Sequence, residues 1–331
     1  MRIAVIGAGS WGSAVAGLLG EKGNAVRLWA RHASLAEEIN TTHRNPSYLT
    51  DLVFPKTVSA TSDLADACAG AEALVLVTPS SAVAKMGERL ASSLAADTPV
   101  VLLSKGIEGT TGRLLLDVLA DELGNKDRLA VLSGPNHAEE VGKGTLSGTV
   151  IASSSLKTAE LLQEIFATQA FRVYTSTDIT GVQLCGAAKN IIAISCGFAA
   201  GLGFGDNTVA MLMTRGLAEI SRLVTGLGGD QITCMGLAGM GDLIATCTSP
   251  HSRNRSFGLE LAQGGSLEAY QQRTHMVVEG ALACQTLTKL AEKHGVDLPI
   301  SSEIRQAVWE AKPLAAVVEA LVARSSKPEF Y

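Results

Sequence analysis

The sequence predicts an α/β protein of two domains: a doubly wound parallel sheet over residues 1–178, followed by an all-helical domain over residues 179–331. Three observations predict it. In the first half, short apolar β-rich runs alternate with helical stretches, as in βαβ units. A glycine-rich turn at residues 7–12 joins the first strand to the first helix. Beyond Asp178 the β-rich runs almost disappear and long helical stretches follow.

The expected strands are short and mostly continuous in apolar residues, which is typical of strands buried on both faces of a sheet. They cover residues 2–6, 25–29, 74–78, 100–104, 129–132, 149–152 and 171–174. Helices are expected between them at residues 13–22, 81–95 and 111–123.

Four long helices are expected in the second half, at residues 181–200, 208–225, 276–294 and 302–323. In the second of these, apolar residues recur every three or four positions, which gives the helix one apolar face. The longest apolar run, residues 191–204, is too short to span a bilayer and is expected to be a buried core helix.

Composition excludes several classes of protein. The 331 residues are 47% hydrophobic with a net charge of −5, so the chain can bury large cores and has no overall attraction for nucleic acid. None of the six cysteines has CxxC spacing, which predicts buried reduced thiols in a cytoplasmic protein. The N-terminus is expected to be a short strand and not a signal sequence, and no membrane span is expected.

The turn at residues 7–12 reads Gly-Ala-Gly-Ser-Trp-Gly, the GxGxxG pattern in its required place between a strand and a helix. Gly7 permits the tight turn, Gly9 lets the backbone approach a pyrophosphate, and Gly12 lets helix and strand pack closely. The free N–H groups at the helix start would hold the phosphates. The first domain is therefore predicted to be a Rossmann-type domain that binds a dinucleotide.

The end of the second strand indicates which dinucleotide. An NAD-selective domain usually has a carboxylate there for the ribose 2′-hydroxyl, whereas this chain has Arg31. A guanidinium suits a 2′-phosphate, so NADPH is expected to be accepted and preferred, with NADH as an alternative cofactor. A solvated surface arginine is the other interpretation.

Lys189 is the candidate acid and base. Together with Asn190 it interrupts a helix that is otherwise small or apolar on all faces, and such a helix is buried. A buried ammonium is costly unless it is paired or functional, and burial lowers its pKa toward neutrality. The alternative is a lysine that reaches solvent from near the helix start.

Further polar groups stand in loops. Lys105 follows the strand at 100–104, and residues 133–138 follow the strand at 129–132, where ligands of open α/β sheets bind. Asp242 ends a glycine-rich turn and is either a site residue or a helix N-cap. Residues 252–254, Ser-Arg-Asn, would suit a phosphate or another oxyanion, with a solvated basic loop as the alternative.

Together these segments resemble the bacterial NAD(P)-dependent glycerol-3-phosphate dehydrogenases over nearly the whole chain. The motifs are GAGSWG (7–12), SKGIE (104–108), SGPNHAEEV (133–141), CGAAKNIIAI (185–194), GLAGMGDLIATCTS (236–249), SRNRSFG (252–258) and VVEG (277–280). The resemblance implies reduction of dihydroxyacetone phosphate to sn-glycerol 3-phosphate with NADPH or NADH, feeding phospholipid synthesis. It also implies a helical second domain like the C-terminal domain of 6-phosphogluconate dehydrogenase, and homodimers are common in the family.

The resemblance further implies roles for individual residues. Lys189 would donate and accept the proton. Substrate contacts would come from Lys105, Gly134, Asn136, Lys189, Asp242, Ser252, Arg253 and Asn254. The cofactor would lie against Gly7, Gly9, Ser10, Trp11, Gly12, Arg31, His32, Tyr48, Lys105, Ala138, Arg253, Val277 and Glu279. Asn136 stands where many relatives carry Ser or Thr.

Two other functions remain open at this point. Another reductase with the same two-domain plan, of the ketopantoate or 6-phosphogluconate type, would use Arg253 on a carboxylate or phosphate. An NADPH-sensing protein would keep the glycine turn but gives no reason for Lys189 and Asn190 in an apolar helix. HExxH, GxSxG and P-loop patterns do not occur, so hydrolysis at a metal and Walker-type phosphoryl transfer have no support and no metal is expected.

Overall fold

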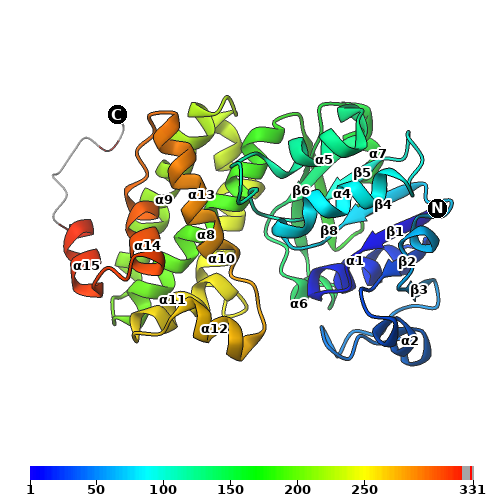
Figure 1. Cartoon of the computed structure of the whole chain (residues 1–331), viewed down its shortest axis with the longest axis horizontal. Helices are drawn as coiled ribbons and strands as arrows, with labels where there is room; N and C mark the ends of the chain where they lie inside the picture. Colours follow the sequence, from blue (N-terminus) through cyan, green and yellow to red (C-terminus); the bar gives the residue numbers. More distant parts are fainter. Residues whose placement is uncertain (323–328, 330–331) are drawn as a thin grey trace.

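The computed structural model describes residues 1–322 and residue 329. The first half forms an eight-stranded sheet in the order β3-β2-β1-β4-β5-β6-β7-β8. The strands are β1 (Arg2–Ile6), β2 (Ala25–Trp29), β3 (Val58–Thr61), β4 (Ala73–Leu76), β5 (Val100–Leu102), β6 (Leu129–Ser133), β7 (Ser147–Ala152) and β8 (Phe171–Ser176). Figure 1 shows this sheet beside a bundle of helices formed by the second half.

The sheet is parallel except at one place. Strands β1 to β6 pair in parallel, whereas β7 pairs antiparallel with β6, and β8 runs parallel to β7. The predicted doubly wound sheet is confirmed in this parallel-dominated form. The reversal at β7 was not predicted, because a strand buried on both faces has the same apolar pattern in either direction.

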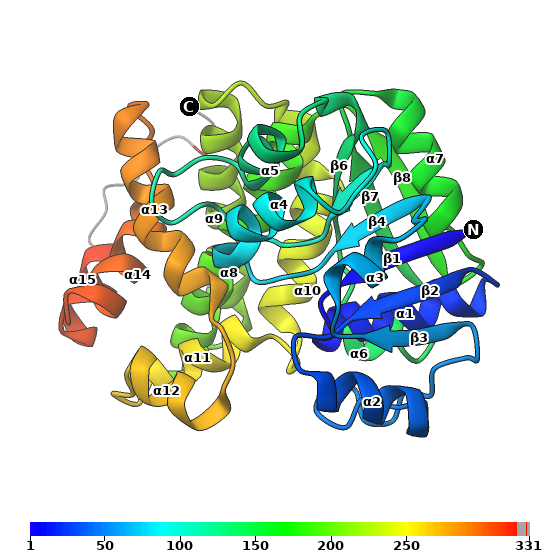
Figure 2. The same cartoon turned by 45° about the vertical axis from the view of Figure 1, so that its right-hand side comes forward.

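Helices cover both faces of the sheet. Ile3 and Val5 of β1 pack in one core with α1 (Ser10–Glu21) and α7 (Leu156–Phe166). Ala4 and Ile6 pack in the other core with α4 (Val83–Ala91) and α5 (Leu115–Leu123), which Figure 2 shows beside the strands. The remaining helices of this half are α2 (Ala33–Thr42), α3 (Leu64–Cys68) and α6 (Ala138–Val141).

The second half is built around α8 (Ile179–Gly201). This helix packs against α9 (Asp206–Gly226), α10 (Asp242–Thr248), α11 (Arg253–Ala262) and α13 (Glu279–Lys293). Within residues 1–322, α8 is the one helix that is long and apolar enough to cross a membrane. However, 89% of its most apolar stretch of 18 residues is buried inside the protein. The expected core helix is confirmed. The argument that it is too short to span was wrong, because the helix begins well before the apolar run.

The helix expected at residues 302–323 is in fact two helices, α14 (Pro299–Trp309) and α15 (Leu314–Val322). Between them Ala311 has a φ of 52°, a value that no helical residue adopts, and Pro313 directly precedes α15. The apolar pattern continues across this break, so periodicity alone did not reveal it. Residue 323 lies outside the described residues, and α12 (Leu267–Thr274) completes the bundle.

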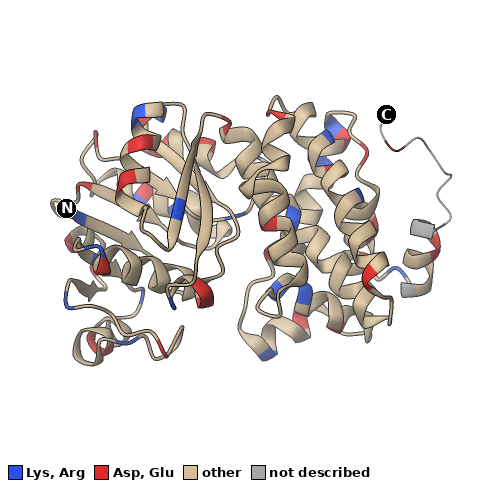
Figure 3. Cartoon of the chain, turned by 180° about the vertical axis from the view of Figure 1, so that it is seen from behind, with Lys and Arg blue, Asp and Glu red and all other residues tan. Residues whose placement is uncertain are grey.

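Charged groups are sparse and mixed. Figure 3 shows Lys and Arg interspersed with Asp and Glu in both halves, in line with the 18% content of charged residues. All six cysteines are free and buried, as expected. Strand β6 packs against α8, and Lys105, in the loop after β5, contacts Asp242 of α10. The candidate site forms at this junction.

Candidate active site

The loop between β1 and α1 has the backbone that a dinucleotide turn requires. Gly7 has a φ of +125°, and a Cβ there would lie 2.6 Å from the carbonyl oxygen of Val77. A Cβ on Gly12 would lie 1.8 Å from the carbonyl oxygen of Gly7, so this position also excludes a side chain. Around Gly9, by contrast, no described atom lies within 4 Å of a Cβ position, and this open side of the loop is where a pyrophosphate would fit.

The N-terminal end of α1 offers hydrogen-bond donors to that open side. Gly9 is the N-cap, and within residues 1–322 no side chain caps the helix. The N–H groups of Ser10 and Trp11 therefore belong to the unsatisfied first turn that binds phosphates. Farther along the carboxyl end of the sheet, Thr78 Oγ1 and Ser133 Oγ are both buried without a hydrogen-bond partner among the described residues. The residues present fit an NAD or NADP molecule.

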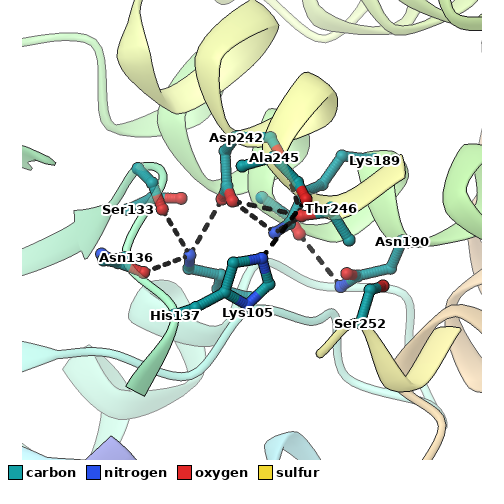
Figure 4. A network of polar contacts seen from close by, with 12 residues as sticks. Lys105, Ser133, Asn136, His137, Lys189, Asn190, Asp242, Ala245, Thr246 and Ser252 are labelled. Atoms are coloured by element: carbon teal, nitrogen blue, oxygen red, sulfur yellow. Dashed lines mark hydrogen bonds and ion pairs between the residues drawn. The ribbon is translucent and has the colours of Figure 1, made fainter. Parts of the chain in front are cut away.

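The centre of the site is an ion-paired cluster between the two halves of the chain (Figure 4). Lys189, on α8, is 5% exposed. Its Nζ donates to Asp242 Oδ1 at 2.5 Å and to Thr246 Oγ1 at 2.6 Å. Lys105, in the loop after β5, donates to Asp242 Oδ2 at 2.9 Å. Asp242, the first residue of α10, therefore holds one lysine on each carboxylate oxygen.

The two lysines differ in how many of their donors are engaged. Lys105 Nζ also donates to the carbonyl oxygen of Gly134 at 2.9 Å and to Asn136 Oδ1 at 2.8 Å. An ammonium has three N–H donors, so those of Lys105 are all used. Lys189 uses two, and its third has no acceptor among the described residues.

Charge and burial set the protonation states of this cluster. Burial lowers the pKa of Lys189 to about 8, although the facing Asp242 carboxylate acts in the opposite direction. Burial alone would raise the pKa of Asp242, but Lys105 and Lys189 together hold this pKa below its usual range. Asp242 is therefore ionised at neutral pH, while the Lys189 amine can both give and take a proton.

Two alternatives from the sequence do not fit this geometry. Lys189 does not reach solvent, because its side chain is buried against α10. Asp242 is not an N-cap, because Gly241 holds that position and Asp242 is the first residue of the helix.

The N-terminal end of α11 adjoins the cluster. Ser252 is its N-cap and accepts a hydrogen bond from the backbone N–H of Arg255 at 3.2 Å. Asn254 Nδ2 donates to Asn190 Oδ1 at 2.9 Å, and Asn254 Oδ1 accepts from the N–H of Gly280 at 2.9 Å. Asn190 thus links α11 to the turn of α8 that carries Lys189. The Arg253 side chain is exposed.

A second contact joins the two halves at the start of α13. Glu279 accepts hydrogen bonds from Ser80 Oγ at 2.6 Å and from the Ser80 N–H at 3.3 Å. Burial raises the pKa of Glu279, against the effect of these bonds. Val277 is half-buried in the segment before α13.

Three predicted cofactor residues lie apart from the lysines. Arg31 and His32 are exposed at the carboxyl end of β2, where Arg31 Nε lies 3.3 Å from His32 Nε2. Tyr48 is also exposed, in the segment between α2 and β3. Ala138, in contrast, begins α6 directly after β6 and its loop. Strands β1, β4 and β5 separate β2 from β6. The predicted cofactor residues therefore lie at two places along the carboxyl end of the sheet, as the two ends of a dinucleotide would.

Sequence reasoning missed three polar residues in this region. Ser80 contacts Glu279, Thr246 accepts from Lys189, and His137 Nε2 lies 3.3 Å from the carbonyl oxygen of Ala245. His137 and Thr246 lie within the motifs at residues 133–141 and 236–249, but no role was predicted for them. The partner of each of the three residues comes from a distant segment. The one available signal was that Thr246 follows Asp242 by a helical turn.

Comparison with known proteins gives the family. The family models described as the N-terminus and the C-terminus of NAD-dependent glycerol-3-phosphate dehydrogenase match residues 2–159 and 178–319. The glycerol-3-phosphate dehydrogenase (NAD(P)+) of Moorella thermoacetica is 48% identical over 97% of this chain and 96% of that protein. The enzyme of the same name from Nocardia farcinica is 47% identical over 99% of both chains.

A solved structure agrees with these matches. The crystal structure of glycerol-3-phosphate dehydrogenase from Coxiella burnetii superposes with a TM-score of 0.93 at 38% identity, covering 98% of this chain and 99% of that one. The resemblance carried by the sequence motifs is confirmed. This chain belongs to the NAD-dependent glycerol-3-phosphate dehydrogenase family.

Proposed function

We propose that this protein reduces dihydroxyacetone phosphate to sn-glycerol 3-phosphate with NADPH or NADH, and that it also catalyses the reverse reaction. The observation that carries the proposal is the buried Lys189–Asp242 pair, whose ammonium keeps one N–H without an acceptor among the described residues. A ketone oxygen placed against that N–H meets both a positive charge and a proton. Family membership supports the same activity.

Lys189 is the general acid and base of the proposed mechanism. When bound, the reduced nicotinamide supplies the hydride equivalent to the ketone carbon. Lys189 stabilises the negative charge that develops on the ketone oxygen and donates its proton there. Asp242 and Thr246 each hold one N–H of the ammonium, so the third points to the substrate. In the reverse direction the neutral amine removes the hydroxyl proton.

We assign the substrate phosphate to the N-terminal end of α11. The guanidinium of Arg253 and the free N–H groups of this helix suit an anion. The O–H of Ser252 and one N–H of Asn254 Nδ2 can also donate hydrogen bonds to a phosphate. Lys105, Gly134, Asn136, Lys189 and Asp242 then surround the ketone end of the substrate. Binding of the phosphate fixes the carbonyl beside Lys189.

We assign the parts of the cofactor to residues along the carboxyl end of the sheet. Gly7, Gly9, Ser10, Trp11 and Gly12 hold the pyrophosphate. The adenosine end lies toward Arg31, His32 and Tyr48, and the guanidinium of Arg31 favours NADPH. The nicotinamide end lies toward Lys105, Ala138, Arg253, Val277 and Glu279.

The finer organisation of the molecule is also proposed. We place the domain boundary at residue 178, which is supported by the end of β8 at Ser176 and the start of α8 at Ile179. Six free buried thiols support a cytoplasmic location, where glycerol 3-phosphate would feed phospholipid synthesis. A homodimer, and the lack of a nucleic-acid partner, stay predictions.

Oxidation of NADPH upon addition of dihydroxyacetone phosphate tests the activity. Dihydroxyacetone, which lacks the phosphate, is the matched control and should turn over far more slowly. Equal rates with both ketones would contradict the phosphate assignment. A folded, NADPH-binding protein that leaves dihydroxyacetone phosphate unchanged would contradict the proposed function.

A further inference from the structure

A cleft of about 380 Å³ lies between the two halves of the chain, next to the ion-paired cluster. Its walls include His137 and Glu140 from the first half, and Ala245, Thr248 and His251 from the second. The substrate and cofactor assignments above give this cleft no role. His137 is the residue that belongs both to the cleft and to the surroundings of the lysines.

The position of His137 is fixed by a contact between the two halves. Its Nε2 lies 3.3 Å from the carbonyl oxygen of Ala245, which ties the N-cap of α6 to α10. Figure 4 shows the His137 ring in the same cluster as Lys105, Lys189 and Asp242. The charges of these three residues all affect the pKa of the ring. Burial, followed by the positive charge of Lys189, lowers the pKa of His137. The imidazolium form is thus a stronger acid than the Lys189 ammonium.

Lys189 must regain a proton after each reductive turnover, and its other neighbours are unsuited to supply it. Asp242 is ionised, since its pKa is held below the usual range. The hydroxyl of Thr246 already donates to the backbone carbonyl oxygen of Asp242 at 2.6 Å. Lys105 uses its three donors within the protein. Of the described charged and titratable groups, His137, Glu140 and His251 line the cleft, and the positive charge of Lys189 lowers the pKa of His137.

We propose that His137 relays protons between the cleft and Lys189. The inference rests on the proposed function, because reduction of the ketone is the step that consumes the Lys189 proton. An N–H bond of the His137 imidazolium breaks and an N–H bond forms on the neutral Lys189 amine, directly or through one water molecule. The neutral ring then takes a proton from water or a buffer acid in the cleft. In the oxidative direction both transfers run backwards.

His137→Gln separates the relay from a structural role. The amide Nε2 of glutamine can donate to the carbonyl oxygen of Ala245 as the ring does, but it does not change protonation state. We expect H137Q to fold and to bind NADPH like the wild type, while its kcat for dihydroxyacetone phosphate falls about tenfold or more. KM for the substrate should change little. His294→Gln, at the exposed end of α13, is the matched control and should keep wild-type kcat.

The response to buffer is the readout that packing alone would not produce. At fixed pH and ionic strength, kcat of H137Q should rise with the concentration of imidazole buffer, because small acids entering the cleft replace the missing ring. Wild-type kcat should stay flat. His137→Ala, which leaves more space, should show the larger rescue.

Two results would overturn the relay. One is an H137Q kcat within about twofold of the wild type. The other is a loss of kcat that imidazole fails to relieve at any concentration. A wild-type protein that does not turn over dihydroxyacetone phosphate would instead overturn the proposed function, so the two failures are distinguishable.

Discussion

Nζ of Lys189 lies 2.5 Å from Oδ1 of Asp242, and both side chains are almost fully buried. Desolvation of such a pair is costly, and removal of either partner leaves an uncompensated charge in the interior. Lys105 forms a second ion pair with the other oxygen of Asp242, so two positive charges stabilise the ionised carboxylate. Lys189 is therefore the member of the cluster whose protonation can change near neutral pH.

Lys189→Ala should abolish turnover without abolishing cofactor binding. Loss of a general acid typically lowers the rate by about 10²–10⁴-fold, whereas the turn at residues 7–12 remains intact. Steady-state kinetics and a fluorescence titration with NADPH measure the two effects. Lys157→Ala, at an exposed position of α7, is the control. Near-normal kcat in the Lys189 variant would remove this residue from the mechanism.

The pH dependence of the rate should have opposite signs in the two directions. With the pKa of Lys189 lowered to about 8, the protonated form that reduction requires is depleted above that pH. The reductive kcat should therefore fall as pH rises through about 8, and the oxidative kcat should rise over the same range. Rate profiles in both directions over about pH 6 to 10 measure this. The native fold and the cofactor must be shown to be stable over the same range. Parallel profiles in both directions would contradict the assignment.

Substitutions at Asp242 and Lys105 should move that pH profile in opposite directions. The Asp242 carboxylate raises the pKa of Lys189, so Asp242→Asn should shift the reductive limb to lower pH. Lys105 lowers the pKa of Lys189, so Lys105→Met should shift the limb to higher pH. Both variants will also turn over more slowly, but the direction of the shift is independent of that loss. Shifts of the same sign would show that the limb does not report Lys189.

The sequence predicted most of the fold because burial on both faces of a sheet leaves unmistakable apolar runs. Strands β1 and β2 have the expected bounds. Strand β3 was missed, because its four residues, Val-Ser-Ala-Thr, alternate only weakly. Helix α1 begins at Ser10 and not at residue 13, since Ser-Trp-Gly was read as part of the turn. Helices α2 and α7 were also not identified.

The candidate site was predictable where its chemistry is concentrated in one segment. Lys189 stands out because its helix is otherwise apolar, and the glycine turn because its spacing is fixed. The Ser80–Glu279 contact was not predictable, because it joins positions 199 residues apart. Lys105 was predicted as a site residue from its place after a strand, but its three acceptors were not predictable, because they come from two other segments of the chain. Only the packing of the two halves brings these groups together.

Arg31→Asp should shift cofactor preference from NADPH toward NADH. The substitution removes a guanidinium that suits the 2′-phosphate and places a carboxylate near the ribose 2′-hydroxyl. A hydrogen bond to a charged group is worth about 1.5–3 kcal/mol, so the ratio of kcat/KM values should change by about 10- to 100-fold. Arg172→Asp, exposed on β8, is the control for the change in net charge. An unchanged ratio would mean that the 2′-phosphate is bound elsewhere.

Glu219 should make the helical half less stable as pH rises. Its carboxyl group lies buried on α9 and accepts from the N–H groups of Ile300 and Ser301 at 2.6 and 3.2 Å, at the start of α14. Burial raises the pKa of Glu219 to about 7, above the 4.5 expected in an unfolded chain. The protonated form therefore favours folding below pH 4.5, and this contribution is lost as pH rises through about 7.

Comparison with Glu219→Gln isolates that effect, because glutamine stays neutral at every pH. The free energy of unfolding of the wild type, minus that of the variant, should decrease between about pH 5 and pH 8 by an amount on the order of 3 kcal/mol. Urea unfolding at each pH measures it, with the exposed Glu292→Gln as control. A difference that stays constant with pH would show that Glu219 is ionised throughout, held so by the two N–H groups that begin α14.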